Sequence, residues 1–195
     1  NARSAHFVPH GDGLFLIGAS SSGDNDLILS DTGTDWWHPD PLPEACGGGT
    51  FTGGGVELVG DTIVVVGGGV ACRSSDGGHS FEAVTIDDTI DRWKSDLVFD
   101  GSRLSVWASG QHFTSDDGGA TWNAEAVTSE EGPGRHQAWG DGVYVGVGGA
   151  YDDQAFYRST DGTHWDRLPA EAFTAGHGIA HLLFTWVEPN DVCGG

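Results

Sequence analysis

The sequence is poor in positive charge. Lysine occurs once in 195 residues, as Lys94, and lysine and arginine together number 8. Aspartate and glutamate number 29, which gives a formal net charge of −21 at pH 7. Phosphate backbones and anionic membrane surfaces repel a protein of this charge. We therefore expect neither a nucleic-acid partner nor membrane insertion.

Methionine is absent, and the chain begins with Asn1 rather than with a signal peptide. This start predicts a processed or excised piece of a longer protein, although a trimmed signal peptide explains it as well. Complete catalytic signatures are also missing. The sequence has no Gly-x-Ser-x-Gly elbow, and segment 177–181 carries glycine where the helix of a zinc protease needs glutamate.

The sequence does contain a short motif, rich in serine, aspartate and glycine, that occurs four times. The first serines of the copies are separated by 44, 41 and 44 residues. Repeats of roughly 40–50 residues are typical of four-stranded propeller blades. The sequence therefore predicts an all-β fold, a β-propeller built of four-stranded antiparallel blades. We call the four copies the Ser-Gly turns, residues 30–36, 74–81, 115–122 and 159–165.

Each Ser-Gly turn has the chemistry of a hairpin. A short acidic side chain accepts hydrogen bonds from backbone N–H groups just ahead of it, and glycine supplies the positive φ that reverses the chain. The aromatic residue that closes the turn can bury its ring between neighbouring sheets, which stabilises the fold by roughly 1.5–3 kcal/mol per fully covered side chain. The repeated phrase is therefore predicted to be a structural device.

The Ser-Gly turns resemble the Asp-box, or BNR repeat, whose pattern is Ser-x-Asp-x-Gly-x-x-Trp. Turns 74–81 and 115–122 fit at full length, with Phe81 in place of tryptophan, whereas turn 159–165 is one residue shorter. Turn 30–36 is also shorter and carries Thr32 at the aspartate position. The resemblance implies a secreted type of propeller whose boxes lie away from the active face. It implies structural roles for Asp76, Gly78, Asp117, Gly119, Trp122, Asp161 and Trp165.

A second repeated feature, a Gly-Asp or Asp-Gly turn entering a β-rich run, predicts the blade boundaries. We expect a single domain, 1–195, with blades near 4–41, 54–86, 94–128 and 135–169 and a partial blade at 177–195. Propellers usually close with 4 to 8 blades, so the partial blade leaves the ring incomplete. Three closures are open: the final strand pairs with the first blade, a missing segment supplies further blades, or a partner chain completes the ring.

The three cysteines, Cys46, Cys72 and Cys193, are too few for a disulfide-built scaffold. Cys46 falls on the linker into the second predicted blade and Cys72 on the third strand of that blade, so a disulfide between them is plausible. Cys193 is then unpaired, which predicts a companion chain or a missing N-terminal segment. No Cys-x-x-Cys pair is present.

Clustered loop carboxylates offer the oxygen ligands that calcium takes. The candidate ligands are Asp24 and Asp26 in one loop and Asp152 and Asp153 in another, with an ambiguous third group at Asp87, Asp88 and Asp91. None of these segments matches an EF-hand loop. Solvated loop carboxylates and adaptation to salty surroundings explain the same residues, so calcium is a candidate and no cofactor is required.

The candidate ligand site is the funnel where the first inner strands begin and the loops between blades gather. Aromatic, basic and hydrogen-bonding groups there suit a sugar or another polar ligand. The alternative is that the two tryptophans are core residues between blades. The candidate ligand-binding residues are Arg92, Trp93, Asp96, Arg135, His136, Trp139 and His181, with His6 and His177 nearby.

Two classes of function follow. The first is a secreted, non-catalytic propeller for recognition or assembly that binds a glycan or a protein through the funnel. The second is an extracellular glycoside hydrolase that acts on polysaccharide with a pair of carboxylates in the funnel. The Arg-Ile-Pro signature that the sialidase resemblance would require is missing. Complete scaffold motifs without a complete catalytic motif favour recognition, in an extracellular or periplasmic location.

Overall fold

The computed structural model describes residues 27–46, 55–90, 96–128, 134, 136–148 and 155–169, and the backbone alone of 2–10 and 13–20. In this part of the chain nearly all regular structure is β. The one helical element there is the short 3-10 turn η1 (Glu44–Cys46). No helix among the described residues is long and apolar enough to span a membrane.

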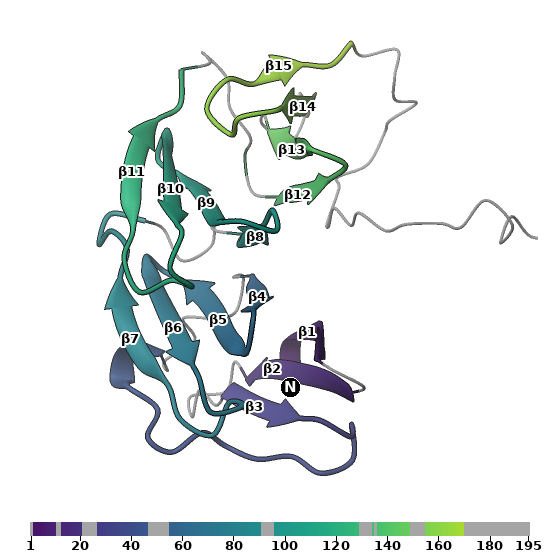
Figure 1. Ribbon diagram of the computed structural model, residues 1–195, viewed down its shortest axis with the longest axis vertical. Helices are drawn as coiled ribbons and strands as arrows, with labels where there is room; N and C mark the ends of the chain where they lie inside the picture. The colour runs from purple at the N-terminus through teal and green to yellow at the C-terminus, as the bar shows by residue number, and fades with distance from the viewer. Residues whose placement is uncertain are drawn as a thin grey trace, which may run out of the picture.

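The strands form four antiparallel sheets, each in sequence order (Figure 1). The first has three strands, and a single bridge between Leu29 and Trp37 stands where a fourth would lie. Each of the others has four strands. The strands are β1 (Ala2–His10), β2 (Gly13–Ser20) and β3 (Leu27–Ser30); β4 (Val56–Val59), β5 (Thr62–Gly67), β6 (Val70–Ser74) and β7 (Glu82–Thr85); β8 (Val98–Phe99), β9 (Leu104–Ala108), β10 (Gln111–Ser115) and β11 (Asn123–Ala126); and β12 (His136–Gly140), β13 (Val143–Gly148), β14 (Ala155–Ser159) and β15 (Asp166–Arg167).

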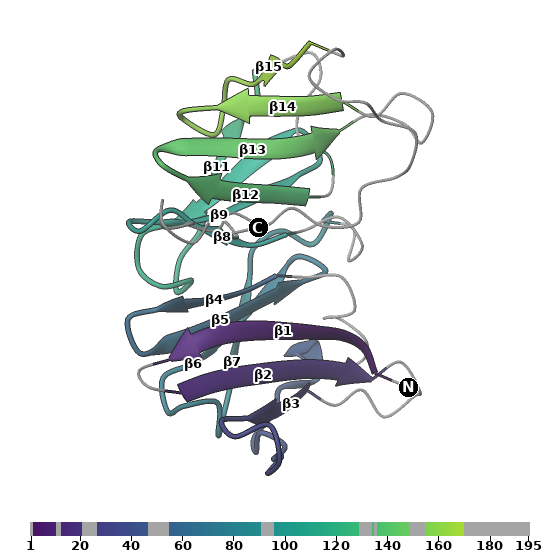
Figure 2. The same ribbon diagram turned by 90° about the vertical axis from the view of Figure 1, so that its right-hand side faces the viewer.

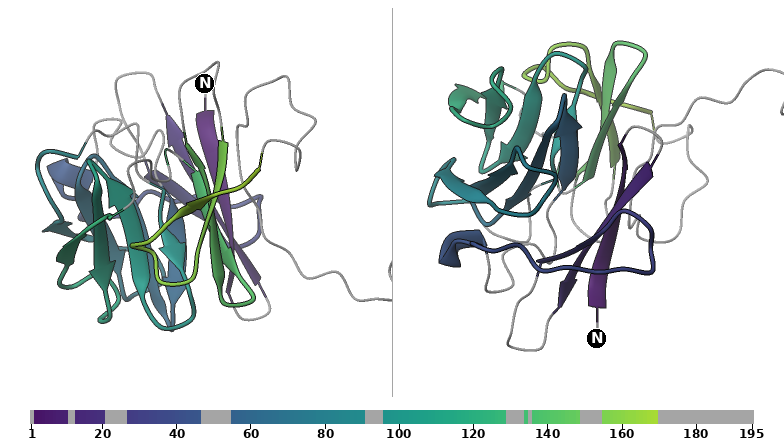
Figure 3. Two further views of the ribbon diagram at one scale, coloured as in Figure 1. Left: turned by 90° about the horizontal axis from the view of Figure 1, so that it is seen from above. Right: turned by 60° about the horizontal axis from the view of Figure 1, so that its bottom comes forward.

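The sheets follow one another along an arc, with the first and the fourth at its two ends (Figures 1 and 2). Their first strands lie along the inner side: β1 contacts β4, β4 contacts β8, and β8 contacts β12. Figure 3 shows the same succession of sheets from two further directions. The all-β propeller architecture predicted from the repeats is confirmed, in the form of a partial propeller.

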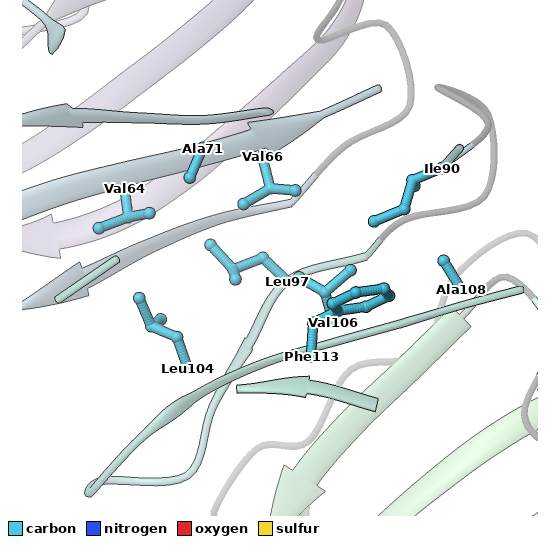
Figure 4. Close-up of a cluster of buried hydrophobic side chains, with 9 residues drawn as sticks. All are labelled: Val64, Val66, Ala71, Ile90, Leu97, Leu104, Val106, Ala108 and Phe113. Carbon is cyan, nitrogen blue, oxygen red and sulfur yellow. The ribbon is translucent and has the colours of Figure 1, made fainter. Parts of the chain in front are cut away.

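Strand alternation divides the core into layers between the sheets, because successive side chains of a strand point to opposite faces. In β5, Ile63 and Val65 pack toward the first sheet, whereas Val64 and Val66 pack toward the third. Figure 4 shows the second of these layers, with side chains from both sheets meeting in it. The buried residues of that layer are Val64, Val66, Ala71, Ile90, Leu97, Leu104, Val106, Ala108 and Phe113.

The Ser-Gly turns share one hydrogen bond. In each turn a serine Oγ accepts the N–H of the glycine that reverses the chain. The donor to acceptor distances lie between 2.7 and 2.8 Å. The serine is buried or nearly so in every copy, so this bond satisfies a backbone donor that faces the core. The four pairs are Ser30 with Gly33, Ser74 with Gly78, Ser115 with Gly119, and Ser159 with Gly162.

In three of the turns an aspartate side chain accepts the hydrogen bonds that the sequence predicts for it. Asp76 takes the Ser80 N–H at 3.0 Å together with the Ser80 hydroxyl, and these bonds hold its pKa well below the usual range. Hydrogen bonding by Thr121 likewise lowers the pKa of Asp117, to about 2. Burial alone would raise the pKa of Asp161, but the bonds it accepts outweigh burial and lower the pKa.

Thr32 forms the first turn without a carboxylate. Its Oγ1 accepts the N–H groups of Thr34 at 3.2 Å and Asp35 at 3.0 Å. A hydroxyl oxygen thus takes the acceptor position that aspartate occupies in the other copies, and the departure from the repeated pattern does not abolish the turn.

Cys46 and Cys72 form the predicted disulfide, with their Cα atoms 5.9 Å apart. The bond ties η1 to β6, and both cysteines are fully buried. Cys193 lies outside the described residues, as does the predicted partial blade at 177–195.

The closing aromatics of the turns differ in burial, which corrects the expectation that all of them are core residues. Phe81 and Trp165 are 5% and 6% exposed. Trp122 is only partly buried, and Trp36 is 46% exposed. In the first turn it is the next residue, Trp37, that packs on the core.

This difference gives a first prediction. Trp165→Ala should lower the free energy of unfolding by about 3–5 kcal/mol, because it empties a buried site between two sheets. Trp122→Ala should cost about half as much or less, because its ring is already partly in water. Urea unfolding of both variants measures the difference. Equal costs would contradict the burial that separates them.

A second prediction concerns the disulfide. Replacing both Cys46 and Cys72 with alanine should lower the free energy of unfolding by about 3 kcal/mol, because the unfolded chain is then released from a closed loop. The residues are 26 positions apart. Cys193→Ala is the matched control and should leave the urea midpoint nearly unchanged. A double variant as stable as the parent would rule out the bond in solution.

Candidate functional site

The inner side of the arc is the place where residues from several sheets meet. β4, β8 and β12 each open a sheet, and in the described structure each is hydrogen-bonded to one neighbouring strand only. Their registers place Leu58, Phe99 and Trp139 at equivalent positions, opposite Ile63, Leu104 and Tyr144. We call residues 55–59, 96–99 and 136–140 the inner edge.

A carboxylate and an imidazole meet on the inner edge between the third and fourth sheets. Asp96 Oδ2 lies 3.1 Å from His136 Nδ1 and accepts the backbone N–H of Gln137 at 3.3 Å. Both ionisable side chains are about one quarter exposed. The pair is therefore close to water while its geometry is fixed by a neighbouring strand.

Gln137 completes this group. Its Nε2 donates to the carbonyl of Gly134 at 2.8 Å, and the residue is only 5% exposed. Its Oε1 is a buried acceptor with no hydrogen-bond partner among the described residues. A buried acceptor without a partner costs free energy, and a hydrogen-bond donor that reaches it removes this cost.

Glu57 makes a similar contact one sheet earlier. Its Oε1 accepts the backbone N–H of Phe99 at 3.3 Å. Burial raises the pKa of Glu57 to about 7, and the Phe99 hydrogen bond lowers it only in part. The carboxyl group thus titrates near neutral pH on a strand that is otherwise apolar.

The two carboxylates follow one geometric rule. Glu57 reaches from β4, and Asp96 from two residues before β8, to a backbone N–H on the first strand of the next sheet. That N–H is one position further along the strand in both cases, because Glu57 is equivalent to Val98 and Asp96 to His136. The same side chains therefore join the sheets and supply the polar groups of the inner edge.

The structure brings together some of the predicted ligand-binding residues and separates others. Asp96 and His136 are in contact. Trp139 is three residues from His136 on the same strand, so it points to the opposite face, where it packs with the buried aromatics of the third core layer. For Trp139 the alternative reading, a core residue between blades, is therefore the one the structure favours. Arg92, Trp93, Arg135, His177 and His181 lie outside the described residues, and of His6 only the backbone is described.

Sequence reasoning missed Glu57 and Gln137. The signal for Glu57 was available, since a single glutamate stands inside the apolar run of β4. Gln137 carried no comparable signal, because a glutamine next to a histidine is unremarkable in sequence. Its importance arises only from burial and from the neighbouring sheet.

The predicted calcium ligands are not tested by this structure. Asp24, Asp26, Asp152, Asp153 and Asp91 lie outside the described residues. Asp87 accepts the N–H and the hydroxyl of Thr89, which is a local turn contact. Within the described part of the chain, no three histidine, cysteine or acidic residues gather closely enough to hold a metal ion.

A second polar group, at His112, belongs to the packing between sheets. The imidazole stacks on Trp107 with ring centroids 4.7 Å apart, and its Nε2 lies 3.0 Å from Ser105 Oγ. Burial, assisted by the charge of Arg103, lowers the pKa of His112 to about 4. The ring is therefore neutral at pH 7 and inaccessible to a ligand.

Comparisons with known proteins support the fold alone. No family model matches the sequence, and no curated protein matches it. Among solved structures, YCF48 bound to D1 peptide is 15% identical with a TM-score of 0.53 over 83% of this chain. YjhT is 11% identical with a TM-score of 0.56 over 84%, and YCF48 from Cyanidioschyzon merolae is 15% identical with a TM-score of 0.53 over 85%.

These similar proteins are β-propellers. The chain spans 52% of the length of the peptide-bound YCF48, 56% of the Cyanidioschyzon merolae protein and 69% of YjhT. The match thus agrees with the arc of sheets described above.

The raised pKa of Glu57 gives a third prediction. The folded state holds the Glu57 proton up to about pH 7, whereas an unfolded glutamate loses it near 4.5. Glu57 therefore destabilises the fold increasingly as pH rises from 4.5 to 7, and fully above that window. Glu57→Gln should raise the free energy of unfolding by about 1–3 kcal/mol more at pH 8 than at pH 4.5.

The measurement is urea unfolding of parent and variant at both pH values. Other titrating groups, His112 among them, are present in both proteins and cancel in the difference. The exposed Glu125→Gln, on the last strand of the third sheet, is the matched control and should show no such pH dependence. A gain for Glu57→Gln that is equal at both pH values would contradict the raised pKa.

Proposed function

We propose that the chain is a non-catalytic recognition or assembly propeller that binds a protein segment along its inner edge. One observation carries the proposal. Asp96 and His136 form a fixed, partly exposed pair, held by the buried Gln137, at the place where the first strands of neighbouring sheets come together. The pair offers a carboxylate and an imidazole next to strand edges, and both suit a polypeptide ligand.

The charge of the chain indicates what kind of segment binds. With a net charge of −21, the protein attracts and steers positively charged partners and repels acidic ones. The Asp96 carboxylate is about one quarter exposed, and a carboxylate takes hydrogen bonds from donors such as lysine and arginine side chains. The proposed ligand is therefore a basic protein segment. The YCF48 structure described as bound to D1 peptide supplies a precedent for a propeller with a peptide ligand.

The remaining features of the proposal follow from the sequence. The Ser-Gly turns act as Asp-boxes with a purely structural role, and the acidic groups of three of them are occupied by their own turns. The buried disulfide supports a secreted or periplasmic location, since disulfides persist in oxidising compartments. We also propose three less central features. They are a glycan as an alternative ligand, calcium bound in the acidic loops, and a companion chain held by Cys193.

The alternative function is a glycoside hydrolase, and one observation favours it. A glycosidase needs one carboxyl group that stays protonated near neutral pH and a second that is ionised. The pKa of Glu57, about 7, suits the first role, and Asp96 is the candidate for the second. A recognition propeller uses the same two residues only to join sheets and bind ligand.

The fourth prediction tests the proposal with arrays of immobilised peptides of equal length that are basic, neutral or acidic, and with a glycan array. The parent protein should bind basic peptides at low salt, and binding should weaken as salt screens the charges. Asp96→Asn and His136→Ala should each reduce binding by about tenfold, the effect of losing one well-placed polar contact. The exposed Asp116→Asn removes the same charge far from the inner edge and should bind like the parent.

Each other outcome decides against the proposal. Binding that is confined to the glycan array would replace the peptide ligand by a sugar. Release of reducing ends from polysaccharide, abolished by Glu57→Gln, would establish the hydrolase. Peptide binding that Asp116→Asn weakens as much as Asp96→Asn would reduce the interaction to net charge and remove the inner edge as its site.

A further inference from the structure

The three interfaces between the described sheets repeat one contact. An N–H group of one sheet donates to a carbonyl in the Ser-Gly turn of the next sheet. Trp37 Nε1 donates to the Gly78 carbonyl at 3.2 Å, and Trp107 Nε1 donates to the Gly162 carbonyl at 2.7 Å. At the middle interface Arg73 Nε donates to the Gly118 carbonyl at 2.7 Å. Each of these turns thus packs on the sheet that precedes it in the chain, which we call the receiving sheet.

The receiving surface of the second sheet is a row of three residues on adjacent strands. Val64 is paired with Arg73 in the register of β5 and β6, and Arg73 is paired with Glu82 in that of β6 and β7. Arg73 also forms an ion pair with Glu82. A Cβ placed on Gly119 of the next turn would lie 3.2 Å from Val64 and 3.6 Å from Arg73. The turn therefore rests directly on this row.

The fourth sheet carries the same row. Val145 is paired with Arg158, and Arg158 is paired with Asp166. The three residues match Val64, Arg73 and Glu82 in register and in chemistry. Arg158 and Asp166 are exposed and Val145 is partly exposed, although the equivalent Val64 is fully buried. No Ser-Gly turn among the described residues is seated on this row.

Among the described residues, no sheet receives the first turn. Trp36 holds the position of Trp165 in the equivalent short turn, yet Trp36 is 46% exposed and Trp165 is 6% exposed. The ring of Trp165 lies against Trp107 of the preceding sheet, with centroids 5.5 Å apart. Trp36 is the one large apolar side chain among the described residues that is exposed.

We propose that two copies of this chain dock reciprocally, with turn 30–36 of each copy seated on the Val145, Arg158 and Asp166 row of the other. Arg158 donates to the Thr32 carbonyl, which stands immediately before the turn glycine as Gly118 does in the third sheet. Trp36 covers Val145. The two interfaces are alike, so the pair closes on itself and encloses eight sheets, within the 4 to 8 blades with which propellers usually close.

A second copy is the occupant that the chain itself supplies. Within the described residues, the same molecule carries a turn without a receiving sheet at one end of the arc and a receiving row without a turn at the other, and this row repeats the one on which turn 115–122 rests. This proposal is independent of the basic ligand proposed above. The proposed dimer interface is formed by the indole of Trp36 and the guanidinium of Arg158, whereas the net charge of −21 on each copy opposes association. Salt should therefore strengthen the dimer by screening that repulsion.

The fifth prediction is tested by native mass spectrometry and light scattering over a concentration series, at low and high salt. All proteins carry Cys193→Ser, so an intermolecular disulfide cannot produce a dimer. The parent should be a dimer that is tighter at high salt. Trp36→Ala and Arg158→Gln should each weaken the dimer by about tenfold or more, since both remove a central contact of the interface.

The matched control is Arg103→Gln, which removes an exposed guanidinium that is not on the receiving row. It should dimerise like the parent. Circular dichroism of the variants shows that a loss of dimer is not a loss of fold, and Trp36 is exposed enough that its removal should not unfold the chain. A parent that is monomeric at every concentration overturns the proposal. So does a dimer that neither substitution weakens, and a series of masses that grows with concentration overturns the closed pair.

Discussion

The fold depends on one hydrogen bond, from the N–H of the turn glycine to a buried serine Oγ, repeated in four turns. It fixes where the glycine lies, and glycine is needed because the neighbouring sheet leaves no room for a side chain. A Cβ on Gly78 would lie 2.3 Å from Leu29, and one on Gly162 would lie 2.5 Å from His112. The adjacent carbonyls then accept the indole and guanidinium N–H groups that join the sheets. The residues that form each turn therefore also make the contacts that join neighbouring sheets.

The inner edge uses a different solution to the same problem. In the described structure no fifth strand pairs with these edges, and the carboxylates of Glu57 and Asp96 reach across to two of their backbone donors. A carboxylate that is held between sheets has less water around it, which explains the high pKa of Glu57. The acidity of the chain thus has two roles. Most carboxylates lower self-association and favour basic partners, whereas these two connect neighbouring sheets at the junctions where a ligand would bind.

The repeats predicted the architecture well, because turn residues and strand periodicity are local properties. The strand order, the role of Ser-Gly turns and the Cys46–Cys72 bond follow from them. Burial of the closing aromatics could not be predicted, because it depends on a neighbouring sheet: Trp165 packs on the ring of Trp107, whereas among the described residues no sheet covers Trp36. The site was predicted only in part. Asp96 and His136, both named as ligand candidates, are in contact. The two readings left open for Trp139 depend on the face that it occupies, which only the register of β12 decides. Gln137 was missed because its role depends on its burial, which the sequence does not reveal.

The three receiving surfaces are not interchangeable, although each donates a hydrogen bond to a glycine carbonyl of the turn that packs on it. Leu29 with Trp37, Val64 with Arg73, and Trp107 with His112 differ in volume, polarity and hydrogen-bonding reach. Each turn is matched to the surface beneath it, so exchanging two blades would leave a void at one junction and a clash at another. The contacts between neighbouring blades therefore specify the order of the blades, as the covalent order of the chain does. A circularly permuted or split version of the chain should find the same neighbours, because each junction identifies its own partner.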